Sequence, residues 1–166
     1  LEQLAMVARE FEALVFVDAV SSMGGIPLEM DKWGVDYVMS GSQKAWMCPP
    51  GLTIVAIGER CQAAYERSTF PKFFWDYASM KKAATEGSGA TTPPLSLLYA
   101  FDAALNMMLE EGVEQVWARH ASLGAQMRAG VERLGLQLFA DPAVASNTVT
   151  AILMPTGVSS AAVIKA

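Results

Sequence analysis

Cysteine, histidine and long apolar runs are scarce in this sequence, and each scarcity excludes a class of protein. The two cysteines, Cys48 and Cys61, have a spacing that fits no metal site, so we expect reduced thiols and no bound metal. No apolar run approaches the roughly 20 residues that span a bilayer, and the N-terminal stretch lacks the basic segment of a signal peptide. A cytoplasmic protein that does not associate with membranes is therefore expected.

Basic residues are also in the minority. Lys and Arg number 12 against 17 Asp and Glu, which gives a net charge of −5 and makes nucleic acid an unfavourable partner. Hydrophobic residues, by contrast, make up 52% of the chain, which suits a well-buried core or further burial in an oligomer. The chain starts without Met and ends in what reads as the beginning of a helix, so we expect a piece of a longer protein.

Apolar residues recur at helical and at strand-like spacing in turn, which predicts an α/β order through about residue 110 and an α–β–α order after it. We expect a change of domain near that point. Residues 68–92 are aromatic, polar and weakly periodic, which is typical of a long functional loop or an interface segment. The expected strands are 13–17, 35–39, 52–57 and 147–155, and the expected helices are 1–12, 62–67, 95–111, 113–134 and one from 159 onward.

Two charged residues stand out at the ends of expected strands. Asp18 closes the apolar run 13–17, and Lys44 follows the next strand in "MSGSQKAWMCPPG". If those two strands are adjacent and parallel, both residues lie at the sheet edge where α/β proteins bind ligands. A carboxylate there costs desolvation energy unless a cation or a hydrogen-bond donor meets it. The alternative without function is a salt bridge or helix cap for Asp18 and a surface position for Lys44.

A lysine amine at such a site can condense with an aldehyde once burial or nearby positive charge lowers its pKa. Pyridoxal phosphate is the usual aldehyde, and it needs a lysine for the Schiff base and an aspartate beneath the pyridine nitrogen. Val20 is a candidate for the apolar contact on the ring face. Gln43 and the loop 90–92 are candidate phosphate donors.

The segments "VDAVSSMGG", "GSQKA" followed by "PPG", and "GATTPPLSLLYAFDAAL" carry a resemblance. In this order they resemble the class V aminotransferases of the fold-type I group, nearest the serine–glyoxylate and alanine–glyoxylate aminotransferases, over essentially the whole chain. The resemblance implies that residues 1–110 are the C-terminal part of a cofactor-binding large domain, with a mostly parallel sheet and flanking helices. Residues 111–166 would start a small α+β C-terminal domain.

The same resemblance implies roles for matching residues. Lys44 would be the Schiff-base lysine and proton carrier, Asp18 would pair with the pyridine nitrogen, and Val20 would pack on the ring. Gln43 would lie beside the phosphate or the ring oxygen. Thr92, in "TTPP", matches a threonine that holds the partner's cofactor phosphate in a homodimer. A tyrosine that some relatives carry three residues earlier is Gly89 here.

The implied reaction is transamination between a small amino acid, serine or alanine, and a 2-oxo acid, glyoxylate or pyruvate. The family places its glycine-rich phosphate loop upstream of this sequence and its substrate-binding arginine downstream, so the chain alone is expected to be inactive. Two alternatives remain open at this point. One is a cysteine desulfurase or lyase of the same fold, and the other is a non-enzymatic fragment in which Asp18 and Lys44 form a buried ion pair.

Other chemistry-bearing residues fit structural roles better. His120 lies on the apolar stripe of an expected helix, which indicates packing. Ser21 and Ser22 lack the G-x-S-x-G surroundings of a hydrolase nucleophile. The segment "GSGATT" lacks the GK[ST] context of a phosphate-binding P-loop. Trp46 and Trp75 are expected to pack as ordinary aromatic residues.

Overall fold

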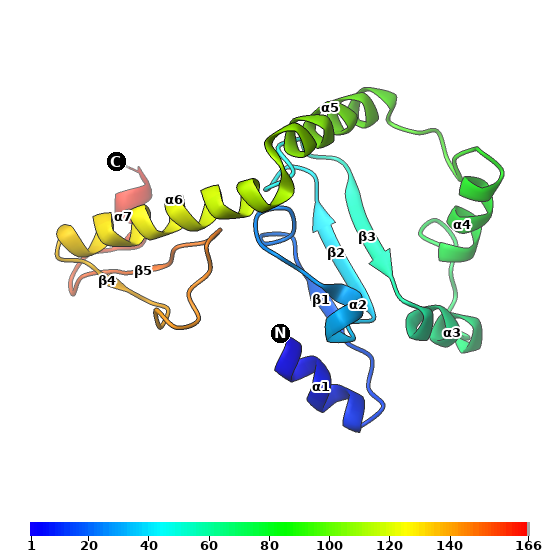
Figure 1. Ribbon diagram of the computed structural model, residues 1–166, viewed down its shortest axis with the longest axis horizontal. Helices are drawn as coiled ribbons and strands as arrows, with labels where there is room; N and C mark the ends of the chain where they lie inside the picture. The colour runs from blue at the N-terminus through cyan, green and yellow to red at the C-terminus, as the bar shows by residue number, and fades with distance from the viewer. Residues whose placement is uncertain (166) are drawn as a thin grey trace.

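A three-stranded sheet lies at the centre of the first part of the molecule (Figure 1). The computed structural model describes residues 1–165. The strands are β1 (Phe16–Asp18), β2 (Tyr37–Gly41) and β3 (Thr53–Ile57), in the order β1-β2-β3. β1 runs parallel to β2, with Asp18 opposite Met39, and β3 is antiparallel to β2. The parallel pairing of the first two strands, from which the position of the site was predicted, is thus present.

Helices surround this sheet, and α5 lies above the end of β2 and the start of β3 in Figure 1. The core beneath them is small: Ala5, Ala19, Val35 and Val38 are buried. Apolar side chains of β1, β3, α2 and the connecting segments pack around these four residues. The mixed α/β order was predicted. The helices of this part are α1 (Glu2–Glu10), α2 (Met30–Trp33), α3 (Glu59–Arg67), α4 (Tyr77–Thr85) and α5 (Leu95–Glu111).

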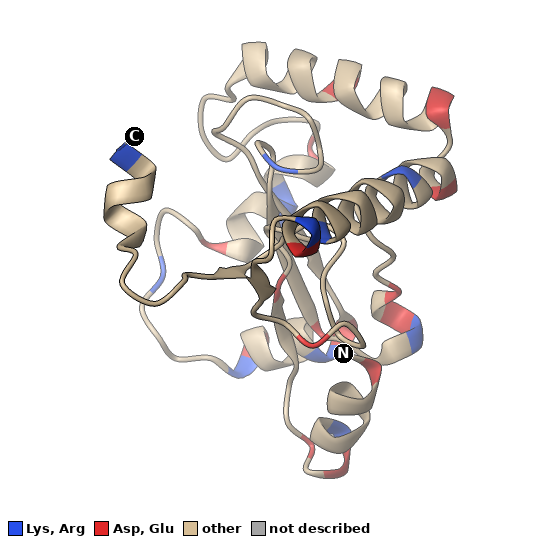
Figure 2. Ribbon diagram, turned by 90° about the vertical axis from the view of Figure 1, so that its left-hand side faces the viewer, with Lys and Arg blue, Asp and Glu red and all other residues tan. Residues whose placement is uncertain are grey.

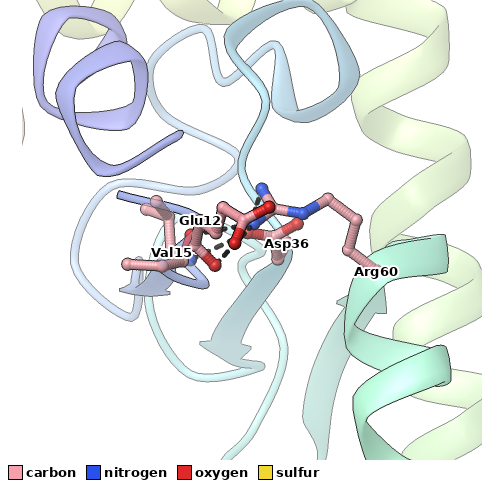
Figure 3. A network of polar contacts seen from close by, with 5 residues as sticks. Glu12, Val15, Asp36 and Arg60 are labelled. Atoms are coloured by element: carbon pink, nitrogen blue, oxygen red, sulfur yellow. Dashed lines mark hydrogen bonds and ion pairs between the residues drawn. The ribbon is translucent and has the colours of Figure 1, made fainter. Parts of the chain in front are cut away.

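A buried carboxylate joins the elements at the start of the parallel ladder (Figure 3). Asp36, only 3% exposed, accepts a hydrogen bond of 2.8 Å from the backbone N–H of Val15 and pairs with Arg60 Nη1 at 3.4 Å. Arg60 Nη2 donates to the carbonyls of Glu12 and Ala13 at 3.2 and 3.0 Å. Glu12 has a φ of 55°, a left-handed conformation that costs a non-glycine residue about 1 to 2 kcal/mol. The Arg60 contacts stabilise this turn. The network therefore links the residues that precede β1 to the start of β2 and to α3.

The expectation of an irregular segment over 68–92 is wrong in its middle, where α4 forms. Asp76 caps this helix, since its Oδ2 accepts a hydrogen bond of 3.1 Å from the backbone N–H of Ser79. The hydroxyl of Tyr65, on α3, donates to the same carboxylate, and this bond, followed by those from Ser79, lowers the pKa of Asp76. α4 therefore depends on a cap, Asp76, that a tyrosine of α3 orients. The weak periodicity of the segment gives no sign of this cap.

The second part of the chain begins at Gly112, whose φ of 89° bends the chain between α5 and α6 (Val113–Arg133). α6 packs against β4 (Gln137–Leu138), which pairs antiparallel with β5 (Ile152–Leu153), and α7 (Ser160–Lys165) comes after β5. The expected strand 147–155 is thus reduced to β5. Arg128 donates to the carbonyl of Ser146 and to Asn147 Oδ1, so side-chain hydrogen bonds replace ladder bonds in that segment.

Charge is spread over the molecule and does not form a basic face. Figure 2 shows Lys and Arg on several elements, interspersed with Asp and Glu. Within residues 1–165, no helix is both long and apolar enough to cross a membrane. Large apolar side chains are nevertheless exposed, among them Phe73 at 93% and Trp75 at 77%.

Replacing Asp36 by alanine should lower the free energy of unfolding of the full-length protein by about 2 to 4 kcal/mol. The variant leaves the Val15 N–H without an acceptor and Arg60 without its carboxylate, whereas Asp36→Asn keeps an acceptor oxygen and should cost about half as much. Denaturation in guanidinium chloride measures both. The control is Lys32→Ala, which removes an exposed pair with Glu29 of 2.9 Å and should cost less than about 0.5 kcal/mol. Equal losses in Asp36→Ala and Lys32→Ala would contradict the role given to the network.

Candidate active site

Asp18 is the last residue of β1 and lies at the edge of the sheet where β2 also ends. Its Oδ1 accepts a hydrogen bond of 3.0 Å from the backbone N–H of Val20, a short turn that directs the chain away from the strand. The next residue, Ala19, extends the ladder, since its N–H donates to the Met39 carbonyl at 2.9 Å. The side chain of Asp18 is exposed. An apolar strand therefore presents a carboxylate at its carboxyl end, as predicted.

Lys44 lies on the loop 42–52, which links β2 to β3. Ser42, fully buried, closes the neck of this loop: its hydroxyl donates to the Pro49 carbonyl at 2.7 Å and accepts from the Leu52 N–H at 3.2 Å. Within the loop, the Met47 N–H donates to the Lys44 carbonyl at 3.0 Å and forms a tight turn. The side chain of Lys44 is exposed. The loop is thus closed at its base and presents the amine to its surroundings.

The far end of this loop packs on the first turn of α5, and glycine is required there. Gly51 has a φ of 131°, and a Cβ at this position would lie 2.6 Å from Leu97 Cδ1. The Sγ of buried Cys48 also lies 3.8 Å from the Leu97 carbonyl oxygen. The lysine loop is therefore fixed between β2 and α5.

A pocket of about 360 Å³ opens beside this loop. Val20 and Gln43, the two residues expected to contact the ring and the phosphate, both line it. A Cβ on Gly41 would lie 2.8 Å from Gln43 Oε1, so glycine leaves room for this amide to fold back over the strand end. The rest of the lining comes from the end of β2 and the start of β3: Met39, Ser40, Gly41, Gly51, Leu52 and Thr53.

Four of the five predicted site residues thus gather at one edge of the sheet. Asp18 lies two residues before Val20, and Lys44 directly follows Gln43 in the chain. Thr92 lies in the exposed segment before α5 and does not line the pocket. Among the residues that the structure describes, Asp18 and Lys44 form no ion pair, and both are exposed. The alternative in which they form a buried ion pair is therefore wrong.

Pyridoxal phosphate fits the groups at this edge. Lys44 makes no hydrogen bond through its side chain within residues 1–165, so its amine is available, and the second oxygen of Asp18 is likewise unused in that range. Val20 offers an apolar surface and Gln43 an amide, both in the pocket. These are some of the groups that a pyridine ring carrying an aldehyde and a phosphate requires.

Two serines and a tryptophan contribute to the site in ways that the sequence did not indicate. Ser42 closes the lysine loop, and Trp46 Nε1 donates to the hydroxyl of Ser40 at 3.0 Å. We expected Trp46 to be an ordinary packing residue. The only signal was the position of two small polar residues, Ser40 and Ser42, beside an apolar strand, where each must find a partner.

The fold is shared with solved aminotransferase structures. An alanine–glyoxylate aminotransferase from Nostoc sp. superimposes with a TM-score of 0.90 at 32% identity, covering 98% of this chain and 44% of that one. The architecture is therefore that of the fold-type I pyridoxal-phosphate-dependent aminotransferases, and this chain contains a fragment of their large domain.

The family is established by the sequence comparisons. The family model described as aminotransferase class-V matches residues 1–165. A serine–glyoxylate aminotransferase from Methylorubrum extorquens is 41% identical over 97% of this chain and 42% of its own length. A protein from a Synechococcus strain named "Soluble hydrogenase, small subunit" is 42% identical over 89% of this chain and 38% of its own. The chain belongs to the class V aminotransferase family, and it spans about two fifths of the length of these relatives.

Proposed function

We propose that the full protein is a pyridoxal-phosphate-dependent aminotransferase that transfers an amine from a small amino acid to a 2-oxo acid. The observation that carries this proposal is the position of Asp18 and Lys44. They follow adjacent parallel strands at one sheet edge, beside a pocket lined by Val20 and Gln43. Membership of the class V aminotransferase family supports it.

Each residue has a distinct task in this proposal. Bound pyridoxal phosphate supplies an electron-withdrawing ring that stabilises negative charge on the substrate Cα. Lys44 would hold the cofactor through its amine, and the same amine would carry the proton between the substrate Cα and the cofactor C4′. Asp18 keeps a proton on the pyridine nitrogen, Val20 packs on the ring, and Gln43 lies beside the phosphate or the ring oxygen.

For the substrates, we propose serine or alanine as the amine donor and glyoxylate or pyruvate as the acceptor. The relatives support glyoxylate most directly, because the bacterial serine enzyme and the Nostoc alanine enzyme share it in their names. The runner-up, a cysteine desulfurase, needs a mobile and nucleophilic thiolate. Cys48 is buried, and burial followed by the nearby Asp36 carboxylate raises the pKa of the Cys61 thiol, so neither cysteine suits that role.

We further propose a cytoplasmic homodimer, with residues 1–110 in the large domain and 111–166 starting the small one. The bend at Gly112 and the separate β4–β5 pair support this boundary. Phe70, Phe73 and Trp75 are each more than three-quarters exposed, which supports an interface in a symmetric dimer. In that dimer Thr92 would reach the partner's cofactor phosphate. The free thiols of Cys48 and Cys61 support a reducing compartment.

Borohydride reduction of the full-length protein loaded with pyridoxal phosphate should attach the cofactor irreversibly to Lys44. Peptide mapping by mass spectrometry identifies the labelled residue. Lys72, which lies 4.1 Å above the Tyr65 ring on the surface, serves as the internal control and should stay unlabelled. Label on a lysine other than Lys44 would rule out the assignment.

Asp18→Ala should leave the cofactor bound but slow transamination about 100- to 1,000-fold, the loss expected for one preorganised charge in a dry site. Asp18→Asn is the matched variant, since it keeps an oxygen for the Val20 N–H and removes only the charge. It should be nearly as slow. Single-turnover kinetics with the amino donor measure both, and a wild-type rate in Asp18→Asn would exclude Asp18 as the partner of the pyridine nitrogen.

Thr92→Ala should weaken cofactor binding about 5- to 30-fold, which corresponds to one hydrogen bond to a charged acceptor of about 1 to 2 kcal/mol. The decisive test uses a dimer of one Lys44→Ala chain and one Thr92→Ala chain, purified with two affinity tags. If sites are shared, one site carries both lesions and the other carries neither, so half of the sites regain wild-type affinity. A heterodimer that shows only the two parental affinities would mean that each site is built from one chain.

A further inference from the structure

A hydrogen-bonded relay joins the loop that carries Lys44 to the strand that carries Asp18. Trp46 Nε1–H donates to Ser40 Oγ at 3.0 Å, and the hydroxyl of Ser40 donates to the Ala19 carbonyl at 3.4 Å. Ala19 directly follows Asp18, and Trp46 lies two residues beyond Lys44. The relay therefore spans the two residues on which the proposed chemistry depends, through the end of β2 between them.

The relay is shielded from water at its centre. Ala19 is fully buried and Ser40 is 1% exposed, so an indole N–H or a Ser40 hydroxyl that loses its partner there has no water to replace it. The Ala19 carbonyl also accepts from the N–H groups of Ser22 and Met23 at 3.1 and 2.9 Å. The indole of Trp46 is also held by packing. Phe101, on α5, meets it edge-on with ring centroids 5.8 Å apart, and a Cβ on Gly24 would lie 3.4 Å from the indole Cδ2. The indole N–H is thus held in one direction, toward Ser40.

The turn that holds Lys44 needs such an anchor. Met47 has a φ of 57°, a strained conformation for a residue with a side chain, and its N–H closes the turn on the Lys44 carbonyl. Within the described part of the chain, Trp46 is the one residue of the turn 44–47 whose side chain makes a hydrogen bond. Without that bond, the strain at Met47 would be relieved by movement of the turn, and Lys44 would move with it.

We infer that Trp46 and Ser40 are positioning residues: their relay sets the place of Lys44 relative to Asp18. This inference rests on the proposed roles of those two residues. The relay contacts neither the amine nor the carboxylate, so it acts on the alignment of the groups that move protons. Ser40 lines the pocket, whereas Trp46 does not. Loss of the relay should therefore lower the rate of the chemical step more than the affinity for pyridoxal phosphate.

The test compares Trp46→Phe and Ser40→Ala in the full-length enzyme. Trp46→Phe keeps the ring packed on Phe101 and removes only the N–H. Each variant should slow the single-turnover reaction with the amino donor about tenfold. Because Ser40 also lines the pocket, affinity is judged on Trp46→Phe, whose Kd for pyridoxal phosphate should change less than about twofold. The double variant should be no slower than the slower single variant, because the two residues act as one unit. The control is Lys32→Ala, which removes an exposed ion pair with Glu29 away from the relay and should change neither the rate nor the Kd more than about twofold.

Hydrogen exchange supplies a readout that is independent of activity. In cofactor-free full-length protein, Trp46→Phe should speed amide exchange about tenfold or more in peptides from both 17–23 and 42–52, since the relay joins these segments. Faster exchange in 42–52 alone, or a rate loss that merely tracks cofactor loss, would overturn the inference and leave Trp46 a packing residue. Borohydride labelling of wild-type Lys44 is scored first and separately. If it fails, the proposed function falls; if it succeeds and both variants turn over at the wild-type rate, only the positioning role falls.

Discussion

The parallel pairing of β1 with β2 is the constraint on which the rest of the candidate active site depends. It places Asp18 opposite Met39, near the point where β2 gives way to the lysine loop. Because successive side chains on a strand point to opposite faces, a slip of one residue would turn Asp18 to the other face of the sheet. Asp36 opposes such a slip, since its carboxylate binds the N–H of Val15 where the ladder begins. Asp36 does not line the pocket, but by fixing the register of β1 it influences the position of Asp18.

Side-chain hydrogen bonds also hold the two strained positions of the backbone. Glu12 and Met47 have φ values of 55° and 57°, and each lies in a turn next to one of the paired strands. Arg60 donates to the carbonyl of Glu12, and Trp46 anchors the turn of Met47 to β2. Strain of this kind persists only where its surroundings oppose relaxation. These bonds restrict the lysine loop to a defined conformation, and a loop ordered by its own contacts lowers the entropy that binding must cost.

The residues that could be predicted from the sequence are those whose signal is local. Asp18 and Lys44 each interrupt the end of an apolar run, and a short crossover between two runs predicts parallel neighbours. Ser40 and Ser42 carry no such signal, because their partners, the carbonyls of Ala19 and Pro49, are set by the fold. The same holds for α4, whose cap at Asp76 depends on a tyrosine of α3. Local pattern thus pointed to Asp18 and Lys44, the groups we propose to react, and tertiary contacts decide what holds them.

Many apolar side chains of this segment are incompletely buried, which fits a chain that carries only part of a site. On the stripe predicted for α6, Val116 is fully buried, whereas Leu123 and Met127 are 54% and 57% exposed. Apolar surface on this scale marks faces against which further protein packs, and the chain spans only about two fifths of its relatives. In the function proposed here, the sheet edge supplies groups that hold and activate the cofactor, and the contacts to the substrate are left to the rest of the protein. Relatives that share this segment bear different amino donors in their names, serine in one and alanine in another, so likeness over this segment alone does not fix the donor.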